Sequence, residues 1–266
     1  MPKSRLCKIC GSETILVFNR GWSGKPYNLS YYRCNDEKCI FLHTDYIDNW
    51  SDEQISKMYE GHICGGGDQR EYLPLDKVNL AKVILPNAHK ILDVGSGEGL
   101  GVSVLRKAGF EAYGYDVVPP NVCQEYITTG DRACVGGTYD VVTAIEVLEH
   151  LIEPVDTCRW IASLLKEGGV FAFSTYTFDP NRHDANWWYL DIVGHVSLHT
   201  RSSLRLLAEA SGFTVVTDVF STHVWIRKDS IPTGAATKIK TKHVLKKLLD
   251  SQSYQVVWNR IKTKIA

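Results

Sequence analysis

Four cysteines near the start of the chain have the residue type and the spacing of metal ligands. Cys7 and Cys10 form a C-x2-C pair, and after 23 further residues Cys34 and Cys39 form a C-x4-C pair. Four thiolates suit the tetrahedral coordination of zinc, and a site closed by four protein ligands leaves no position for a substrate. The spacing therefore predicts a structural Zn2+ site. Two alternatives stay open here: His43 as the fourth ligand in place of Cys39, and cysteines that bind no metal.

A second group of chemically active residues lies in the middle of the chain and combines carboxylates with imidazoles. Glu146, Glu149 and His150 stand at positions i, i+3 and i+4, a spacing that would bring them to one face of a helix. His195 follows in a later segment that reads as a loop. Such side chains act as general acids and bases or bind divalent ions. The sequence therefore predicts a catalytic group of Glu146, His150 and His195.

A glycine-rich segment lies between these two groups and follows an apolar run. Asp93 is followed by Gly95 and Gly97, and another acidic residue, Asp116, ends the next apolar run. Glycines at such a turn let the backbone approach a cofactor closely, and a carboxylate after the second strand can accept hydrogen bonds from two ribose hydroxyls. The dinucleotide fingerprint G-x-G-x-x-G is not met, because Leu100 occupies the position of its third glycine.

Alternating apolar runs and helical patterns indicate how these groups are positioned. From residue 75 onward, helix and strand signals alternate, and the helices end at glycines, as helices commonly do. This alternation predicts a doubly wound α/β sheet, whose ligands bind at the carboxyl ends of the strands. Strands are predicted at residues 89–94, 110–115, 139–145, 170–175, 213–219 and 223–227, and helices at 51–59, 75–85, 102–108, 154–166 and 200–211.

Composition is that of a globular protein and excludes a largely disordered or fibrous chain. Hydrophobic residues make up 44% and charged residues 23% of the 266 residues. Thirty basic residues balance thirty acidic ones, so no net charge draws the whole chain to nucleic acid. No run of about 18 apolar residues and no signal-type leader occurs, so a cytoplasmic protein with reduced thiols is expected. Basic residues are concentrated after residue 227, where an amphipathic helix could touch a membrane surface or a partner.

The motifs together resemble motif I and later motifs of the class I S-adenosylmethionine-dependent methyltransferases, over roughly residues 81–227. The resemblance rests on Asp93-Val94-Gly95-Ser96-Gly97, on Asp116, and on the segments at residues 139–150 and 165–170. It implies a Rossmann-like sheet of seven strands and S-adenosylmethionine as cofactor. It also implies that Asp93, Gly95 and Gly97 flank the methionine part, that Asp116 takes the ribose, and that Ile145 and Glu146 lie near the methyl group.

The E-x-x-E-H string with a downstream H-x5-R is similar to metal-dependent small-RNA 2′-O-methyltransferases and to ubiquinone-biosynthesis O-methyltransferases. Carried over, that similarity implies a Mg2+ or Mn2+ ion held by Glu146, Glu149, His150 and His195, which would lower the pKa of an acceptor hydroxyl. The alternative is His195 as a general base without metal, since imidazole titrates near neutral pH. Three large aromatic residues precede His195, and they either stack on the acceptor or close the core: Trp187, Trp188 and Tyr189.

The cysteine pairs ahead of such a domain resemble antibiotic-sugar C-methyltransferases, although this chain lacks their further carboxyl-terminal domain. We therefore expect O-methylation of a sugar, glycan or other small natural product. The alternatives are an RNA methyltransferase and a noncatalytic zinc-containing binding module, and a neutral net charge counts against the first. The predicted organisation is a zinc-ribbon-like subdomain at residues 1–48, a helical leader and lid at 49–80, the methyltransferase domain at 81–228 and a basic helical tail at 229–266.

Overall fold

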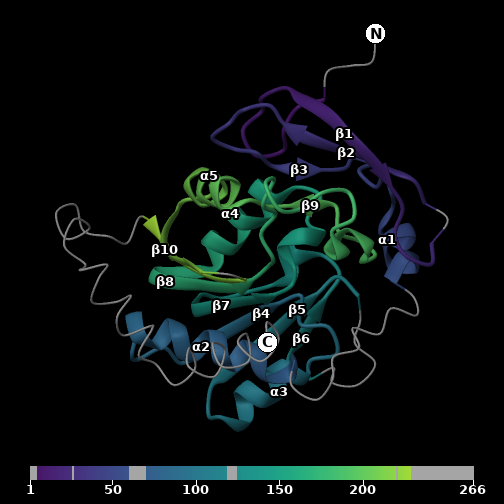
Figure 1. Cartoon of the computed structure of the whole chain (residues 1–266). Helices are drawn as coiled ribbons and strands as arrows, with labels where there is room; N and C mark the ends of the chain where they lie inside the picture. The colour runs from purple at the N-terminus through teal and green to yellow at the C-terminus, as the bar shows by residue number, and fades with distance from the viewer. Residues whose placement is uncertain (1–4, 26, 60–69, 119–124, 220, 229–266) are drawn as a thin grey trace, which may run out of the picture. The chain divides into compact units, whose positions relative to one another are not determined.

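The computed structural model describes residues 5–25, 27–59, 70–118, 125–219 and 221–228 (Figure 1). The lid predicted around Gly65-Gly66-Gly67 and the basic tail at residues 229–266 lie outside this part. The chain forms two compact units, each described here by itself. The first unit combines Met1–Gly65, Glu146–Trp160 and Ser174–Ser211, and the second combines Gly66–Ile145, Ile161–Phe173 and Gly212–Ala266.

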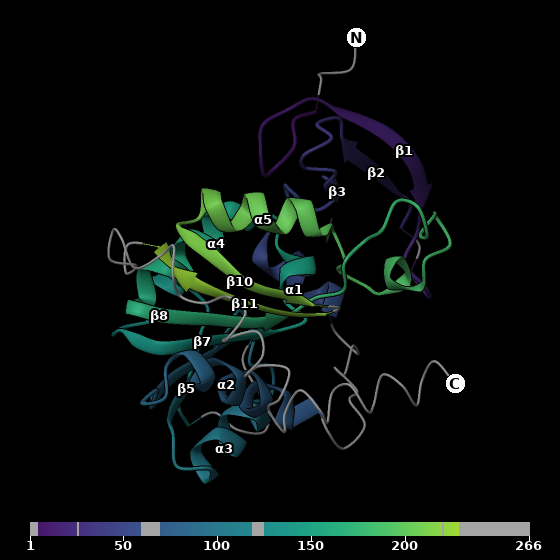
Figure 2. The ribbon, with the colours of Figure 1, turned by 60° about the vertical axis from the view of Figure 1, so that its left-hand side comes forward.

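A seven-stranded sheet is the main element of the second unit. Its strand order is β10-β11-β8-β7-β4-β5-β6, and β4 pairs in parallel with both β5 and β7. The last two strands of the chain, β10 and β11, form an antiparallel hairpin, which lies in front in Figure 2. The strands are β4 (Lys90–Val94), β5 (Glu111–Asp116), β6 (Ile127–Thr129), β7 (Tyr139–Ile145), β8 (Leu165–Ser174), β10 (Phe213–Val219) and β11 (Thr222–Arg227).

Helices α2 (Leu73–Ile84) and α3 (Leu100–Lys107) pack against this sheet, on the same side of it (Figures 1 and 2). Their apolar residues and those of the strands form one buried core, which includes Val78, Val102, Ile91 and Val141. Most residues of β4, β7 and β8 are buried, which explains why these strands read as nearly continuous apolar runs.

The first unit contains a four-stranded sheet with the order β1-β2-β3-β9. Strands β1 (Thr14–Arg20), β2 (Leu29–Cys34) and β3 (Leu42–His43) come from the start of the chain, whereas β9 (Ser197–Leu198) lies about 150 residues later and pairs antiparallel with β3. A buried core joins the same two stretches and includes Tyr31, Leu42, Tyr189 and Leu198. The start of the chain therefore folds together with residues 174–211.

Two of the remaining described helices have N-terminal capping boxes. Helix α1 (Asp52–Tyr59) follows one in which Ser51 and Gln54 each accept a hydrogen bond from the other's backbone amide. Thr200 caps helix α5 (Arg201–Ala210) in the same reciprocal way with Ser203. The other elements are α4 (Pro154–Leu164) and the 3-10 turns η1 (Arg70–Tyr72), η2 (Arg132–Cys134), η3 (Leu148–His150) and η4 (Trp188–Asp191). Among the described helices, none combines the length and apolarity needed to cross a bilayer.

The α/β fold with a seven-stranded Rossmann-like sheet, predicted from the sequence, is confirmed. The predicted domain boundaries stay predictions, as does the zinc-ribbon-like character of residues 1–48. The first compact unit is not continuous in sequence, because residues 146–160 and 174–211 belong with the start of the chain.

Candidate active site

The glycine turn after β4 has the backbone conformation that its sequence suggested. Gly95 and Gly97 have positive φ values of 70° and 52°, which residues with a side chain rarely adopt. The amides of Gly95 and Ser96 both donate to the carbonyl oxygen of Tyr115, at 2.8 and 3.1 Å. A Cβ atom at Gly97 would meet no heavy atom within 4 Å. The turn is thus tied to the end of β5, and Gly97 borders open space.

Asp93 is buried in β4 beneath this turn. The hydroxyl of Thr143, on the neighbouring strand β7, donates to its Oδ1 at 2.6 Å. Burial raises the pKa of Asp93 to about 7, and the bond from Thr143 opposes that rise. Gly101 lies close by, because a Cβ there would be 3.3 Å from Asp93 Oδ2 and 2.7 Å from Pro74. Asp93 therefore links β4 to β7 and lies close to the start of α3.

Asp116 ends β5 and binds backbone on both sides. Its Oδ2 accepts from the amide of Gly97 at 2.8 Å, and its Oδ1 accepts from the amide of Val118 at 3.0 Å. Burial raises the pKa of Asp116, although these amides partly offset the effect. Asp116 thus binds the glycine turn directly, and its predicted contact with the ribose stays a prediction. Ile145 ends β7, the strand next to β4.

Glu146 starts a separate group of candidate residues, in the first unit. It has a positive φ of 53°, and its amide donates to the carbonyl and the hydroxyl oxygen of Ser174, at 3.1 and 3.2 Å. The predicted common helical face is wrong, since only Leu148–His150 form a 3-10 turn and Glu146 turns the chain before it. A non-glycine residue in this conformation is strained, and strained residues are concentrated at functional sites.

Glu149, His150 and His195 meet in the first unit. One carboxylate oxygen and one imidazole nitrogen of each histidine lie within 4.8 Å of one another. The Nδ1 atom of His150 is 3.0 Å from the carbonyl oxygen of Gly194, and the Nδ1 atom of His195 is 2.7 Å from that of Tyr189. A carbonyl oxygen accepts only, so each neutral histidine carries its proton on Nδ1 and a lone pair on Nε2. Metal-ligating histidines are usually oriented in this way.

Tyr189 connects the two carboxylates of the site. Its hydroxyl is 2.5 Å from Glu149 Oε1 and 3.0 Å from Glu146 Oε2. Burial raises the pKa of Glu149 well above its ordinary value, and the nearby charge of Glu146 raises it further. The predicted site is thus joined through a tyrosine that sequence reasoning considered only for stacking or core packing. No sequence signal reveals this link, because Tyr189 lies 40 residues beyond Glu149.

Two further rings extend this tyrosine toward the surface. The ring centroids of Tyr176, Trp188 and Tyr189 form a triangle with sides of 5.3 to 5.4 Å. Tyr189 is buried, whereas Trp188 is 53% exposed and Tyr176 is 44% exposed. Trp187 is buried and closes the core. The predicted aromatic group therefore divides into a buried part and an exposed edge beside the carboxylates.

The four predicted cysteines come together in the first unit. The sulfur atoms of Cys7 and Cys39 are 3.7 Å apart and those of Cys10 and Cys34 are 3.5 Å apart, and all four lie within 4.8 Å of one another. A tetrahedral zinc ion with Zn–S bonds of 2.3 Å requires sulfur separations of about 3.8 Å. His43 is not a member of this group; it is buried in β3 and stacks on Phe41.

Backbone amides also point to the sulfur atoms in the way expected of a metal-binding knuckle. The amide of Ile9 donates to Cys7 Sγ at 3.5 Å, and that of Asp36 donates to Cys34 Sγ at 3.4 Å. Each bond joins a cysteine to the residue two positions later. Amide donors stabilise the negative charge of a thiolate, so each cysteine pair contains one sulfur atom whose thiolate form is stabilised for binding a cation.

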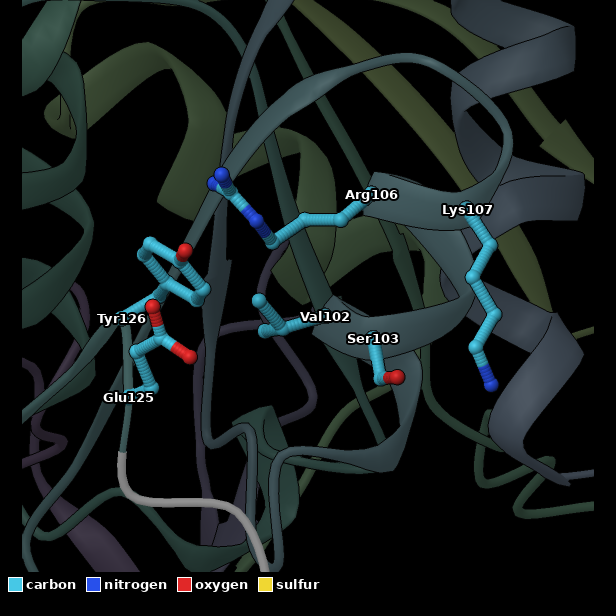
Figure 3. Close-up of a pocket in the computed structure, with 6 residues that line it drawn as sticks. All are labelled: Val102, Ser103, Arg106, Lys107, Glu125 and Tyr126. Carbon is cyan, nitrogen blue, oxygen red and sulfur yellow. The ribbon is translucent and has the colours of Figure 1, made fainter.

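A separate hollow of about 310 Å³ lies beside α3 in the second unit (Figure 3). The Arg106 guanidinium lies 3.5 Å above the ring of Tyr126, and Lys107 extends away from them. Its lining contains none of the residues predicted for cofactor, metal or catalysis. The lining residues are Val102, Ser103, Arg106, Lys107, Glu125 and Tyr126.

Comparison with known proteins agrees with the motifs and the sheet. The sequence pattern of the methyltransferase domain family matches residues 67–218, more than half of the chain. The chain belongs to the methyltransferase domain family. The resemblance to class I S-adenosylmethionine-dependent methyltransferases, predicted from the motifs at Asp93 and Asp116, is thereby confirmed.

Two curated relatives of this methyltransferase are ubiquinone biosynthesis O-methyltransferases. The one from Aliivibrio fischeri (strain MJ11) is 33% identical over 127 residues, which are 40% of this chain and 54% of the relative. The one from Vibrio parahaemolyticus serotype O3:K6 is 35% identical with the same coverage. This methyltransferase thus spans about half the length of the curated relatives it matches.

A solved structure has a similar fold. It is an amino pentose methyltransferase from Micromonospora echinaspora with S-adenosylmethionine bound, and it covers 64% of this chain and 96% of its own length at a TM-score of 0.50. Its sequence identity of 18% supports the shared fold alone.

Proposed function

We propose that this methyltransferase moves the methyl group of S-adenosylmethionine to a hydroxyl of a small-molecule acceptor, such as a sugar, a glycan or another natural product. The observation that carries the proposal is the meeting of Glu149, His150 and His195 in a family whose cofactor already provides an activated methyl group. What remains for the protein is to align the acceptor oxygen and to remove its proton. A carboxylate with two imidazoles is suited to that task.

The second unit takes the cofactor role in this proposal. Gly95 and Gly97 adopt positive φ values and Gly97 borders open space, so the turn fits a ligand that approaches the backbone closely. Asp116, which already orients the turn, would accept hydrogen bonds from the ribose hydroxyls. Asp93 and Ile145 flank the turn from β4 and β7. We therefore assign the binding of S-adenosylmethionine to the same residues for which the motif predicts it.

The first unit takes the acceptor role, and the chain passes directly from Ile145 to Glu146. Glu149, His150 and His195 would hold a divalent ion such as Mg2+ or Mn2+, with Glu146 beside them, and a bound ion supplies a lower pKa for a hydroxyl. Without an ion, His195 is the general base: its Nδ1 proton is held by the Tyr189 carbonyl, so its Nε2 atom is the one that takes the proton.

Exposed aromatic rings next to these groups support a ring-shaped acceptor. Trp188 and Tyr176 are in edge-to-face contact at 5.4 Å, and both pack against Tyr189, whose hydroxyl binds the carboxylates. Aromatic faces stack on sugar and aromatic rings. An acceptor ring on Trp188 would therefore lie one side chain away from the acid–histidine group.

The test combines cofactor binding with an activity assay that includes a chelator. Calorimetry should detect S-adenosylmethionine binding, and release of S-adenosylhomocysteine should be followed with catechol and with methyl glycosides as acceptors. Treatment with EDTA should abolish turnover and Mn2+ should restore it. Full turnover in EDTA would exclude the metal-assisted mechanism and leave His195 as the base. If the protein does not bind S-adenosylmethionine, the proposal as a whole is overturned.

We propose further that Cys7, Cys10, Cys34 and Cys39 hold a structural zinc ion. Their sulfur separations of 3.5 and 3.7 Å support this, because they match tetrahedral coordination without rearrangement. Metal analysis of the purified protein should find about one zinc per chain. Replacement of the exposed Cys10 by Ala should reduce that content, whereas Cys134→Ala, at an exposed cysteine outside the group, should not.

A further inference from the structure

The backbone of His195 is held by strands from the start of the chain. The hydroxyl of Tyr31, in β2, donates to the carbonyl oxygen of His195 at 3.0 Å, and both residues are buried. One residue further along, the amide of Thr44 donates to the carbonyl oxygen of Val196 at 3.0 Å. Strands β3 and β9 then pair at Leu42↔Leu198 and His43↔Ser197. The segment that carries His195 is thus part of the same sheet as the cysteine-bearing strands.

A second attachment lies at the four-cysteine group itself. The carbonyl oxygen of Cys39 accepts from the hydroxyls of Thr200 and Ser202, at 3.0 and 3.1 Å. Thr200 is also the N-cap of α5, so the start of that helix is fixed at Cys39. Residues 195–202 are therefore bound to the N-terminal strands at one end and to a cysteine backbone at the other.

Among the described residues, the cysteine end has only a small apolar core, to which backbone bonds such as Cys34 N–H to the Phe41 oxygen at 2.8 Å and Cys39 N–H to the Asp36 oxygen at 2.9 Å are added. The buried cluster around it consists of Cys7, Cys34, Cys39 and Phe41, with Ile9 and Leu206 packed against it. A cluster with one large aromatic side chain supplies little hydrophobic stabilisation, and small modules of this kind commonly depend on a metal ion to fold. We therefore expect the position of the Cys39 carbonyl oxygen to depend in part on whether the four sulfur atoms are held together.

From these contacts we infer that metal in the four-cysteine site controls the acceptor half of the reaction by holding His195 in place, and that Tyr31 is the positioning residue which transmits this effect. The inference rests on the proposed function for the role of His195, but the attachment itself does not. Cofactor residues Asp93 and Asp116 belong to the other unit, so loss of the metal should reduce turnover without a matching loss of cofactor affinity.

The first experiment removes a single hydroxyl from the full chain. Tyr31→Phe keeps the ring that packs against Phe18 at 5.3 Å and removes the hydroxyl, which donates to His195 and also interacts with the side chain of Trp22. We expect kcat to fall about tenfold, which corresponds to roughly 1.4 kcal/mol, with the dissociation constant of S-adenosylmethionine unchanged. Tyr32→Phe is the matched control, because Tyr32 is the next residue on the same strand and its partner across β3 is His43 rather than His195.

Hydrogen exchange gives a readout that does not depend on activity. Backbone amides of residues 193–200 should exchange faster in Tyr31→Phe and in protein stripped of zinc by a chelator, and added Zn2+ should reverse the second effect. Unchanged exchange in stripped protein would overturn the inference even if methyl transfer is intact. If added Zn2+ slows the exchange but the protein does not methylate hydroxyl groups, the attachment is supported and only the proposed function is overturned. Equal kcat in Tyr31→Phe and Tyr32→Phe would overturn the role of Tyr31.

Discussion

The two compact units bring their chemically active residues together in different ways. In the second unit, Asp93, Gly95, Gly97 and Asp116 lie within 24 residues of sequence, and adjacent parallel strands bring them together. In the first unit, Glu149 and His195 come from segments more than 40 residues apart, and Tyr31 comes from the start of the chain. One half of the chemistry is therefore local in sequence, and the other half depends on tertiary contacts.

This difference indicates where each kind of specificity lies. A turn fixed by strand geometry and by two glycines fits a cofactor that is the same throughout a family. A group assembled from three separate segments can change with any one of them, because each contributes a different side chain or backbone contact. We expect changes in the second unit to alter cofactor affinity and changes in the first unit to alter turnover.

The largest effect is expected at His195. His195→Asn removes the imidazole and keeps a polar side chain, so proton removal from the acceptor is lost and kcat should fall by about 100- to 10,000-fold. The dissociation constant of S-adenosylmethionine should stay within about twofold of the wild-type value, as measured by calorimetry. The matched control is His89→Asn in the second unit, at an exposed histidine, and it should leave both quantities unchanged. If His195→Asn weakens S-adenosylmethionine binding by as large a factor as it lowers kcat, the assignment of turnover to the first unit and cofactor binding to the second is wrong.

The next largest effect tests the other side of the comparison. Asp116→Ala deletes a half-buried carboxylate that accepts from the amides of Gly97 and Val118, so the glycine turn loses its anchor. We expect a loss of roughly 2 to 4 kcal/mol in binding of S-adenosylmethionine, a 30- to 1,000-fold rise in its dissociation constant. Asp131→Ala is the control, since this exposed residue caps only η2. If Asp116→Ala binds the cofactor normally, the assignment of the turn is wrong.

The sequence predicted the second unit well because its signals are local. The apolar run ending at Asp93 and the glycines after it specify a buried strand and a tight turn within a few residues. The hairpin of β10 and β11 was likewise predicted from two apolar segments close together in the chain. Patterns of this kind reflect backbone preferences that do not depend on distant residues.

The first unit could be predicted only in part, since its contacts span long stretches of sequence. The cysteine spacing predicted a four-sulfur group, and the structure brings those four residues together. Nothing in the sequence indicates that β3 pairs with β9, because a two-residue strand has no usable periodicity. The role of Tyr189 was missed for the same reason. The strained φ of Glu146 was missed because a glutamate carries no signal for a left-handed conformation.

A smaller effect concerns the pH dependence of stability in the second unit. Burial raises the pKa of Asp93 to about 7, from an ordinary value of 3.8. Between these two values the unfolded chain releases the proton and the folded chain keeps it, so this residue lowers stability as pH rises through that window. Asp93→Asn should therefore lose less stability than the wild type between pH 4.5 and 7, measured by urea unfolding.

A residue with the opposite shift provides the control for that measurement. Burial alone would raise the pKa of Asp140. The pKa is nevertheless lowered, because Lys166 and the amides of Lys90 and His89 bind the carboxylate. Its contribution is fully present above the ordinary pKa of 3.8 and is lost as pH falls through the lowered folded-state pKa, so Asp140→Asn should reduce stability at neutral pH and matter less as the pH falls below 3.8. Parallel pH profiles for Asp93→Asn and the wild type would contradict the buried, protonated state of Asp93.

The smallest effect concerns the link between the carboxylates of the first unit. Tyr189→Phe keeps the ring between Tyr176 and His195 and removes the hydroxyl that binds Glu149 and Glu146. We expect kcat to fall by about fivefold to thirtyfold, because losing the hydroxyl that serves both carboxyl groups should cost roughly 1 to 2 kcal/mol, with cofactor affinity unchanged. Tyr139→Phe, which removes a bond to the Gly136 carbonyl in the second unit, should spare kcat. A larger loss in the control than in Tyr189→Phe would mean that turnover depends on the sheet of the second unit rather than on the acid–histidine group.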